Sequence, residues 1–259
     1  MKKLLIFPAV LLTLSGFLLK SCESSDSAGS MQKPMPKAAN ANDQNEKKEQ
    51  SQDDANKEGN EKTSLVKQVS MIEGASAKAK TIDNLKAAFR GETTASEKYA
   101  AYSKKAEQEG YREIALLFKA ASMAEKIHAN NHRSVLQESG EAAPTVTPIF
   151  SIGSTKENLQ DAIKGETYEV TTMYPGFINA ATASGSQLAL ISLNYAYKTE
   201  IKHKSMYEKA LVALEANSGK TLPSVYFVCP TCGNTYEIKA PARCGISMTS
   251  SEKFIRVTS

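Results

Sequence analysis

Apolar residues recur at three- and four-residue intervals along much of residues 81–217, as Leu85 and Phe89 illustrate. This spacing is typical of amphipathic helices that turn one face toward a core. The pattern is broken at Gly110, at the Pro- and Gly-containing stretch 139–153, and at Gly185. It therefore predicts four helices joined by two tight turns and one long connection. Their expected bounds are 82–108, 111–138, 155–183 and 186–216.

Two of the predicted helices repeat one another. NLKAAFRGET at 84–93 aligns without a gap with NLQDAIKGET at 158–167. A glycine inside a helix costs about 1 kcal/mol relative to alanine, yet Gly91 and Gly165 occupy the same place in both copies. We infer close packing at these glycines, and we interpret the helical region as two copies of one helical hairpin.

Each hairpin places an acidic residue at matching heights on its two helices. Glu92 lies 18 residues before the turn at Gly110, and Glu125 lies 15 residues after it. At a rise of about 1.5 Å per residue, both are roughly 22 to 27 Å from that turn. The second hairpin repeats this arrangement around Gly185. Packing the two hairpins together should bring the acidic positions into one layer of the bundle.

That layer would contain five carboxylates and two imidazoles. Its members are Glu92, Glu125, His128, Glu166, Glu169, Glu200 and His203. Residues three apart on a helix share a face, which joins each Glu-x-x-His pair and the Glu166–Glu169 pair. Buried carboxylates repel one another and are costly to desolvate unless cations neutralise them. Two Glu and two Glu-x-x-His motifs on four helices hold two metal ions in ferritin-like carboxylate proteins, so we predict a two-metal centre.

Three further residues lie close to these positions in the sequence. His132 has no histidine counterpart in the second hairpin, and we interpret it as a surface residue or one that supports a metal ligand. Tyr99 and Tyr174 follow Glu92 and Glu166 by seven and eight residues. They could pack as core aromatics or form hydrogen bonds near the metals, and we favour the hydrogen bonds.

The N-terminal region differs in composition from the rest of the chain. Residues 1–22 comprise two lysines, an apolar run and Lys-Ser-Cys, as in a signal sequence. The run is short for a membrane span, although an uncleaved anchor is the alternative. Leu-Lys-Ser-Cys resembles the bacterial lipobox, so we expect export and lipidation at Cys22, with attachment to a membrane. Residues 23–78 are polar, lack aromatic side chains and are predicted to be a disordered tether. A net charge of +4 without a basic stripe argues against nucleic-acid binding.

The helical motifs also resemble a known family. GETTASEKYAAYSKKAEQEGYREIALLFKAASMAEKIHANNH, KGETYEVTTMYPGF and TEIKH are similar to segments of rubrerythrins, and the resemblance covers residues 81–257. It implies a mainly α protein. A ferritin-like four-helix bundle with a long crossover (79–220) would precede a small rubredoxin-like β domain of zinc-ribbon type (221–259).

The resemblance assigns a role to each residue of the acidic layer. It implies two iron ions, replaceable by zinc or manganese, held by the seven residues named above, with Glu125 and Glu200 as bridging ligands. It also places Tyr99 and Tyr174 beside the centre, so that the five glutamates and two tyrosines form the catalytic set. The implied activity is reduction of hydrogen peroxide to water by an electron donor that the sequence does not identify, in a homodimer or a higher homo-oligomer.

The C-terminal segment departs from the family pattern. Cys229-x-x-Cys232 and Cys244 match the rubredoxin motif, but Ser247 occupies the place of the fourth cysteine. Four thiolates form the usual iron site. The remaining three, with Ser247, would bind iron or zinc more weakly. A metal-free segment, or a disulfide among the three cysteines, is the alternative.

Three functions therefore follow as hypotheses. The leading one is an exported peroxide reductase that contributes to oxidative-stress defence. The second is a ferroxidase or iron-handling protein that uses the same site. The third is a non-enzymatic metal-binding lipoprotein whose electron relay is impaired by the missing cysteine.

Overall fold

The computed structural model of the protein describes the backbone of residues 45–258 and the surroundings of side chains from residue 62 onward. The predicted signal sequence, its lipidation site at Cys22 and the first part of the predicted tether lie outside the described residues. In the part that is described, no helix is both long and apolar enough to cross a membrane.

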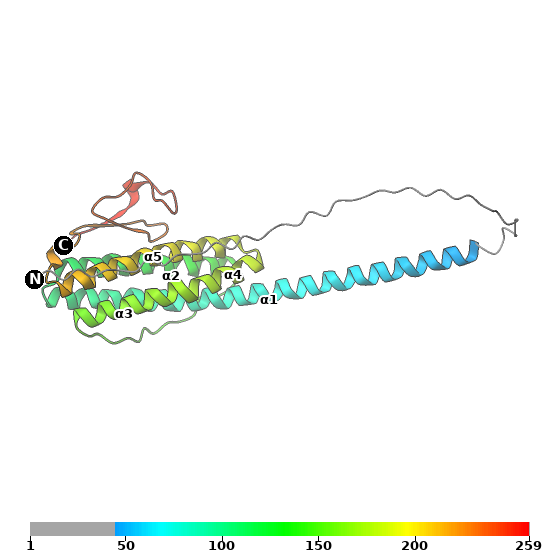
Figure 1. The fold of residues 1–259 in the computed structure, drawn as a ribbon, viewed down its shortest axis with the longest axis horizontal. Helices are drawn as coiled ribbons and strands as arrows, with labels where there is room; N and C mark the ends of the chain where they lie inside the picture. Colours follow the sequence, from blue (N-terminus) through cyan, green and yellow to red (C-terminus); the bar gives the residue numbers. More distant parts are fainter. Residues whose placement is uncertain (1–44, 259) are drawn as a thin grey trace, which may run out of the picture. The chain divides into compact units, whose positions relative to one another are not determined.

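The predicted helical bundle is confirmed (Figure 1). A π-helical segment, η1, joins α3 to α4, so that the third long helix of the bundle is made of three consecutive pieces. The helices are α1 (Asn45–Gln108), α2 (Arg112–Glu138), α3 (Thr155–Tyr168), η1 (Glu169–Met173), α4 (Tyr174–Ser184) and α5 (Gln187–Glu215). The α3, α4 and α2 helices each pack against α5.

Local sequence signals set the ends of these helices. Ser154 and Glu157 form a capping box that starts α3, in which each side chain bonds the other residue's backbone N–H. Gly185 ends α4 in a left-handed conformation (φ 69°) that glycine adopts at little cost. Gly110, with φ 83°, forms the turn between α1 and α2. The two tight turns therefore occur at the glycines that the sequence pattern identified.

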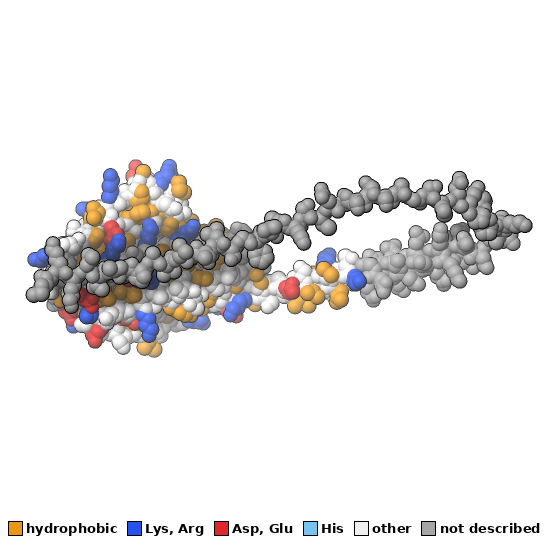
Figure 2. Space-filling view, in the orientation of Figure 1, with side chains coloured by type: hydrophobic (Ala, Val, Ile, Leu, Met, Phe, Trp, Pro, Cys, Tyr) orange, Lys and Arg blue, Asp and Glu red, His pale blue; other side chains and the backbone are white. Residues whose placement is uncertain are grey.

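The first helix differs from the sequence prediction. It begins at Asn45, whereas residues 23–78 were predicted to be a disordered tether. Residues 45–78 contain no proline and many Ala, Glu, Lys and Gln residues, which favour helix even where no core is available. Leu65, Val66 and Ile72 are exposed there, in the region where Figure 2 shows a group of apolar side chains on the helix. From residue 62 to residue 76, where side chains are described, every position of this stretch is therefore exposed and outside any packed core.

The π-helical segment adjusts the register of the second repeat. A π turn accommodates one residue more than an α turn. This extra residue explains why Tyr174 follows Glu166 by eight residues, whereas Tyr99 follows Glu92 by seven. The predicted continuous helix 155–183 is therefore interrupted at η1, and the interruption brings Tyr174 to the place equivalent to Tyr99.

The C-terminal segment forms a small antiparallel sheet. Its strands are β1 (Tyr226–Val228), β2 (Thr235–Glu237) and β3 (Ile255–Val257), in the order β2-β1-β3. Two short 3-10 helices occur in the same segment: η2 (Gly219–Thr221) precedes β1, and η3 (Ser251–Lys253) precedes β3. The sheet packs against α2 and α5, and Tyr226, Val228 and Val257 join the apolar core of the bundle.

Apolar side chains form two clusters along the bundle. One includes Tyr99, Phe118 and Tyr207, and the other includes Leu85 and Leu193. On every long helix, the predicted acidic residues fall between positions of the first cluster and positions of the second. The acidic layer is therefore enclosed by packed apolar side chains on both sides.

Candidate metal centre

Four glutamates, one from each long helix of the bundle, meet in a buried layer. Glu92 comes from α1, Glu125 from α2, Glu166 from α3 and Glu200 from α5, and none is more than 1% exposed. His128 and His203 follow three residues after the glutamates of α2 and α5 and are also fully buried. The structure therefore places these residues in one layer, as the matching heights in the two repeats predicted.

The two histidines point at the same pair of carboxylates. The Nδ1 atom of His128 lies 2.9 Å from an oxygen of Glu125 and 2.9 Å from an oxygen of Glu200. The Nδ1 atom of His203 lies 2.8 Å from the other oxygen of Glu200 and 3.2 Å from that of Glu125. Both glutamates thus lie between the histidines, where a carboxylate can bridge two ions.

The ligand atoms fall into two groups, each with its atoms within 4.8 Å of one another. The first contains Glu92, Glu125, His128 and Glu200, and the second contains Glu125, Glu166, Glu200 and His203. Because Glu125 and Glu200 belong to both groups, the arrangement provides two adjacent sites that share two carboxylates. This is the geometry expected of a two-metal centre.

Glu169 is placed somewhat differently from the other six predicted ligands. It is the first residue of η1, is partly exposed and belongs to neither group. Its charge nevertheless raises the pKa of both Glu92 and Glu166, so its carboxyl group lies near the layer.

The electrostatics of the layer call for cations. Burial, followed by repulsion from neighbouring glutamates, raises the pKa of Glu92, Glu166 and Glu169. Two buried carboxylate oxygens, Glu92 Oε2 and Glu166 Oε2, have no polar partner, and Glu125 Oε1 and Glu200 Oε1 face only an imidazole nitrogen. Unsatisfied buried oxygens of this kind are costly unless a metal ion binds them. Carboxylate oxygen and imidazole nitrogen together suit iron, manganese and zinc, so the residues fit two such ions.

The histidines compensate the charge of the carboxylates. Burial would lower the pKa of His128, but Glu200 and Glu125 raise it to about 10. The same two carboxylates raise the pKa of His203 to about 9 against the opposing effect of burial. Metal binding must therefore displace protons from these imidazoles.

The C-terminal segment fixes which nitrogen of each histidine faces the metals. His128 Nε2 lies 3.0 Å from the carbonyl oxygen of Cys232, which can only accept a hydrogen bond. His203 Nε2 lies 3.0 Å from Thr235 Oγ1, whose own hydrogen is donated to the Gly233 carbonyl. Both Nε2 atoms are therefore donors, which leaves each Nδ1 as the ligand atom.

The two predicted tyrosines bond carboxylates of the layer. The Tyr99 hydroxyl donates to Glu166 Oε1 at 2.7 Å, and the Tyr174 hydroxyl donates to Glu92 Oε1. His132 is buried, with Nε2 3.3 Å from the Tyr174 hydroxyl and Nδ1 2.8 Å from the hydroxyl oxygen of Ser192. His132 therefore supports a predicted ligand through Tyr174, which bonds Glu92, and the surface alternative is wrong.

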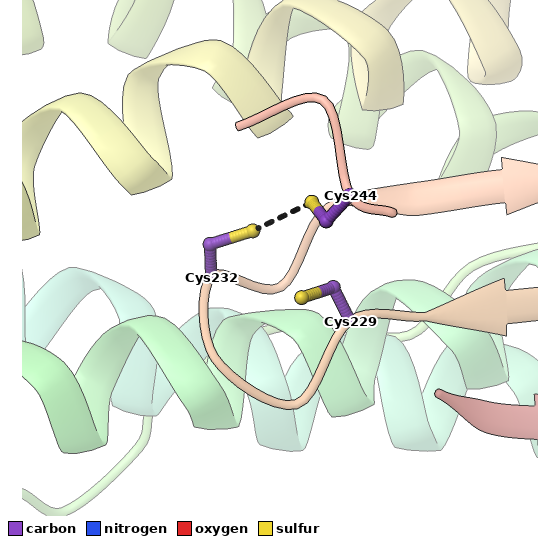
Figure 3. Close-up of side chains that lie close together, drawn as sticks. All are labelled: Cys229, Cys232 and Cys244. Carbon is purple, nitrogen blue, oxygen red and sulfur yellow. Dashed lines mark hydrogen bonds between the residues drawn. The ribbon is translucent and has the colours of Figure 1, made fainter. Parts of the chain in front are cut away.

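The three cysteines of the C-terminal segment form a second cluster. Cys229, Cys232 and Cys244 are buried and free, and their sulfur atoms face one another (Figure 3). The Cys232 and Cys244 sulfurs are 3.4 Å apart, far beyond the roughly 2.05 Å of a disulfide. Ser247 Oγ lies 3.3 Å from Cys229 Sγ. The disulfide alternative is therefore not formed, and three sulfurs and one hydroxyl surround a common point.

The environment of this cluster favours a thiolate at Cys229 and Cys244, whereas the hydrogen bond to Cys229, followed by burial, raises the pKa of Cys232. A hydrogen bond from Cys232 is the largest cause that lowers the pKa of Cys229, to about 4. The Cys244 sulfur accepts side-chain hydrogen bonds from Asn234 at 3.6 Å and from Tyr236 at 3.5 Å. Because the thiolate is the form that binds metals, the cluster suits a soft metal ion.

Comparison with known proteins identifies the family. The rubrerythrin family model matches residues 83–211. Rubrerythrin-2 of Clostridium acetobutylicum is 32% identical over 177 residues, which cover 68% of this chain and 96% of that protein. The chain belongs to the rubrerythrin family. Nigerythrin of Nitratidesulfovibrio vulgaris is 34% identical over 176 residues, or 67% of this chain and 85% of that relative.

Solved structures agree with this assignment. The fully reduced, all-ferrous state of nigerythrin aligns with a TM-score of 0.61 at 34% identity, covering 68% of this chain and 86% of that chain. Membership of the rubrerythrin family, together with the buried Glu and His groups, identifies the bundle cluster as a di-iron site.

Sequence reasoning missed two residues that touch the rubrerythrin centre. Tyr207 follows His203 by four residues, as His132 follows His128, and its buried ring lies 5.5 Å from that of Tyr99. The repeat could have revealed it, because the equivalent position carries a buried aromatic ring in both copies. Thr235 could not be found in this way, because its contact with His203 joins segments without any repeat relation.

Gly233 is expected to tolerate no side chain. Its φ is +75°, and an added Cβ would lie 2.3 Å from His128 Nε2 and 3.1 Å from the Ala124 carbonyl oxygen. Gly233→Ala should therefore displace the Cys229–Cys232 loop from α2, destabilising its docking by roughly 1 to 3 kcal/mol. Limited proteolysis of the iron-loaded protein should show faster cleavage in the C-terminal segment.

Gly245→Ala provides the matched control for this prediction. A Cβ at Gly245 would have its nearest neighbour, the Tyr236 hydroxyl, at an ordinary 3.8 Å. We expect its cleavage rate to match that of the wild type. If the C-terminal segment of the Gly233→Ala protein were cleaved as slowly as that of the wild type, the loop contact with His128 would not be what holds the segment in place.

Proposed function

We propose that the protein is an oxidoreductase that reduces hydrogen peroxide to water at the bundle centre. The observation that carries this proposal is the pair of ligand groups that share Glu125 and Glu200. Two iron ions bound side by side would supply the two electrons that cleave the O–O bond. Membership of the rubrerythrin family supports the same reaction.

The chain's own residues prepare the site for this reaction. Tyr99 and Tyr174 hold one oxygen each of Glu166 and Glu92, which orients the second oxygen of each carboxylate toward the layer. The apolar clusters on both sides exclude bulk water, which strengthens electrostatic interactions inside the site. Burial and Glu200 raise the pKa of Glu169, so this carboxyl group can hold a proton for the departing oxygen.

We further propose that the C-terminal segment is a rubredoxin-like electron relay. Cys229, Cys232, Cys244 and Ser247 would hold iron or zinc there, and only iron would transfer electrons. The Cys232 carbonyl accepts a hydrogen bond from His128. Cys232 itself therefore connects its sulfur atom to a ligand of the bundle centre. This short connection supports direct electron transfer between the two sites.

Stopped-flow spectroscopy of the di-ferrous protein tests the function. The protein is loaded with iron under anaerobic conditions and mixed with equimolar peroxide or with dissolved oxygen. We expect rapid oxidation by peroxide and much slower oxidation by oxygen. Repeated uptake and oxidation of added ferrous iron would instead support the iron-handling alternative. Iron that reacts with neither oxidant would support the non-enzymatic alternative.

We also propose that the protein is exported and attached to a membrane through a lipid on Cys22. The supporting observation is the sequence of residues 1–22. Cys22→Ala should therefore move the protein to the soluble fraction or leave the signal sequence uncleaved, because an apolar run of this length anchors poorly alone. Fractionation of cells and mass determination of the N-terminus measure both effects. Ser21→Ala serves as the control. Membrane attachment of a processed Cys22→Ala protein would exclude lipidation at this residue.

A further inference from the structure

Two tyrosines connect the iron site to the surface of the bundle. The Tyr99 hydroxyl donates to Glu166 in the buried layer at 2.7 Å. The Tyr99 ring centroid lies 6.2 Å from that of Tyr102, one turn further along α1. The Tyr102 hydroxyl in turn donates to Asp161 Oδ2 at 3.0 Å. A continuous series of phenol groups therefore leads from a metal ligand to a carboxylate near solvent.

The second repeat lacks this connection. Tyr174 is equivalent to Tyr99, and three residues later Phe177 stands where the first repeat has Tyr102. The Tyr174 and Phe177 rings are 6.4 Å apart, so the packing is similar. Phenylalanine, however, has no hydroxyl that could release a proton on oxidation. The two halves of the bundle thus share their ligands and differ in the group that follows the tyrosine.

The series ends at a cavity open to solvent. It has a volume of about 450 Å³, and its lining includes Lys98, Tyr102, Phe150, Ser151 and Asp161. The Asp161 side chain is 48% exposed and pairs with Lys98 at 2.7 Å. A proton received by Asp161 can therefore pass to water. The cavity is large enough for a small aromatic molecule to approach Tyr102.

We propose that Tyr99, Tyr102 and Asp161 form a relay that carries oxidising equivalents from the iron centre to this cavity, where a phenolic reductant neutralises them. The relay rests on the iron site and not on the identity of the oxidant. It would protect the buried layer whenever the centre is oxidised faster than the cysteine site supplies electrons. Ser247 makes that condition relevant here, because the cysteine site has only three thiolates.

Each step of the relay conserves protons and electrons. Tyr99 gives one electron to the oxidised iron centre and its hydroxyl proton to Glu166. Tyr102 then gives one electron to the Tyr99 radical, which regains its proton from Glu166, and the Tyr102 proton passes to Asp161. A phenol in the cavity finally returns one electron and one proton to Tyr102, while Asp161 releases its proton to water. The net change is one phenol oxidised to a phenoxyl radical, with its electron delivered to the iron centre and one proton released to water.

Freeze-quench electron paramagnetic resonance tests the relay. The iron-loaded, di-ferrous protein is mixed with excess peroxide, and the tyrosyl radical is measured with iron content determined in parallel. We expect a tyrosyl radical in the wild type that hydroquinone removes. Tyr102→Phe converts the first repeat to the pattern of the second. It should remove the Tyr102 radical and leave any remaining signal insensitive to hydroquinone. Asp161→Asn removes the proton acceptor and should reduce the signal strongly.

Tyr226→Phe is the control, since Tyr226 is buried in the C-terminal sheet outside the relay. Its radical yield should equal that of the wild type. An unchanged signal in Tyr102→Phe would overturn the relay. So would the absence of any tyrosyl radical in a wild type whose iron peroxide does oxidise, and that result would leave the proposed peroxide reduction intact.

A second measurement removes the dependence on peroxide chemistry. Photogenerated ruthenium(III) tris(bipyridine) oxidises tyrosines from solution. Tyr102 is buried but lines the solvent-open cavity, so its oxidation there would run the relay toward the di-ferrous centre. We expect ferrous iron to be oxidised faster in the wild type than in Tyr102→Phe. Equal rates in the two proteins would overturn the relay even if peroxide proved not to be a substrate.

Discussion

Replacing Glu125 and Glu200 together by alanine is expected to leave the bundle without bound iron. Each of these residues belongs to both ligand groups, so the double change removes two of the four ligands from each site at once. It also removes the charge that raises the pKa of His128 and His203. The iron content of the bundle, measured by elemental analysis, should fall from about two ions per chain to none. The reaction with peroxide should be lost as well.

The fold should survive this change. Alanine favours helix, and the four helices are held by the apolar clusters on both sides of the layer. Circular dichroism should therefore report unchanged helix content. Glu138→Ala with Glu208→Ala is the matched control, because these glutamates are exposed on the same two helices. A double variant of the central glutamates that still bound two ions per bundle would refute the ligand assignment.

Replacing Ser247 by cysteine is expected to strengthen metal binding at the C-terminal cluster. Ser247 Oγ already lies 3.3 Å from Cys229 Sγ, so a sulfur in the same orientation would complete a set of four thiolates. A serine hydroxyl holds its proton more tightly than a thiol and is a harder ligand, which disfavours binding as an anion. We expect iron affinity to rise by about tenfold or more, equivalent to about 1.4 kcal/mol.

Absorption and turnover measure the consequence. The wild type should show little of the red absorption of a four-thiolate iron site and poor turnover with a donor that reduces that site. Ser247→Cys should gain both. Ser251→Cys adds a thiol to the same segment outside the cluster and should gain neither. Full four-thiolate absorption together with fast donor-dependent turnover in the wild type would contradict the prediction.

The ligand set of the bundle could be predicted from the sequence because it depends on local quantities. Helix rise, three-residue spacing and the distance from each turn place Glu92 and Glu125 at one height. The repeat supplies the same information for Glu166 and Glu200. The single-residue offset between Tyr99 and Tyr174 was visible as well. Its cause, the π turn that starts at Glu169, required the backbone.

Composition was a weaker guide to the region that precedes the bundle. A polar segment without aromatic residues predicted disorder, because it cannot bury enough apolar surface to form a core. Helix propensity is a separate property, and residues 45–78, which are rich in Glu and Lys, form helix. The sequence of this region carries both signals, and its backbone follows the helix propensity.

The sequence by itself determined the two tight turns, the duplication, the layer of Glu and His residues and the missing fourth cysteine. Only the tertiary structure decided the burial of His132, the approach of Tyr207 to Tyr99, and the contacts of Cys232 and Thr235 with the histidines. The physical reason is that helix periodicity fixes which residues of one segment share a face. Contacts between the C-terminal strands and the bundle depend instead on how separate segments pack, which no local spacing encodes.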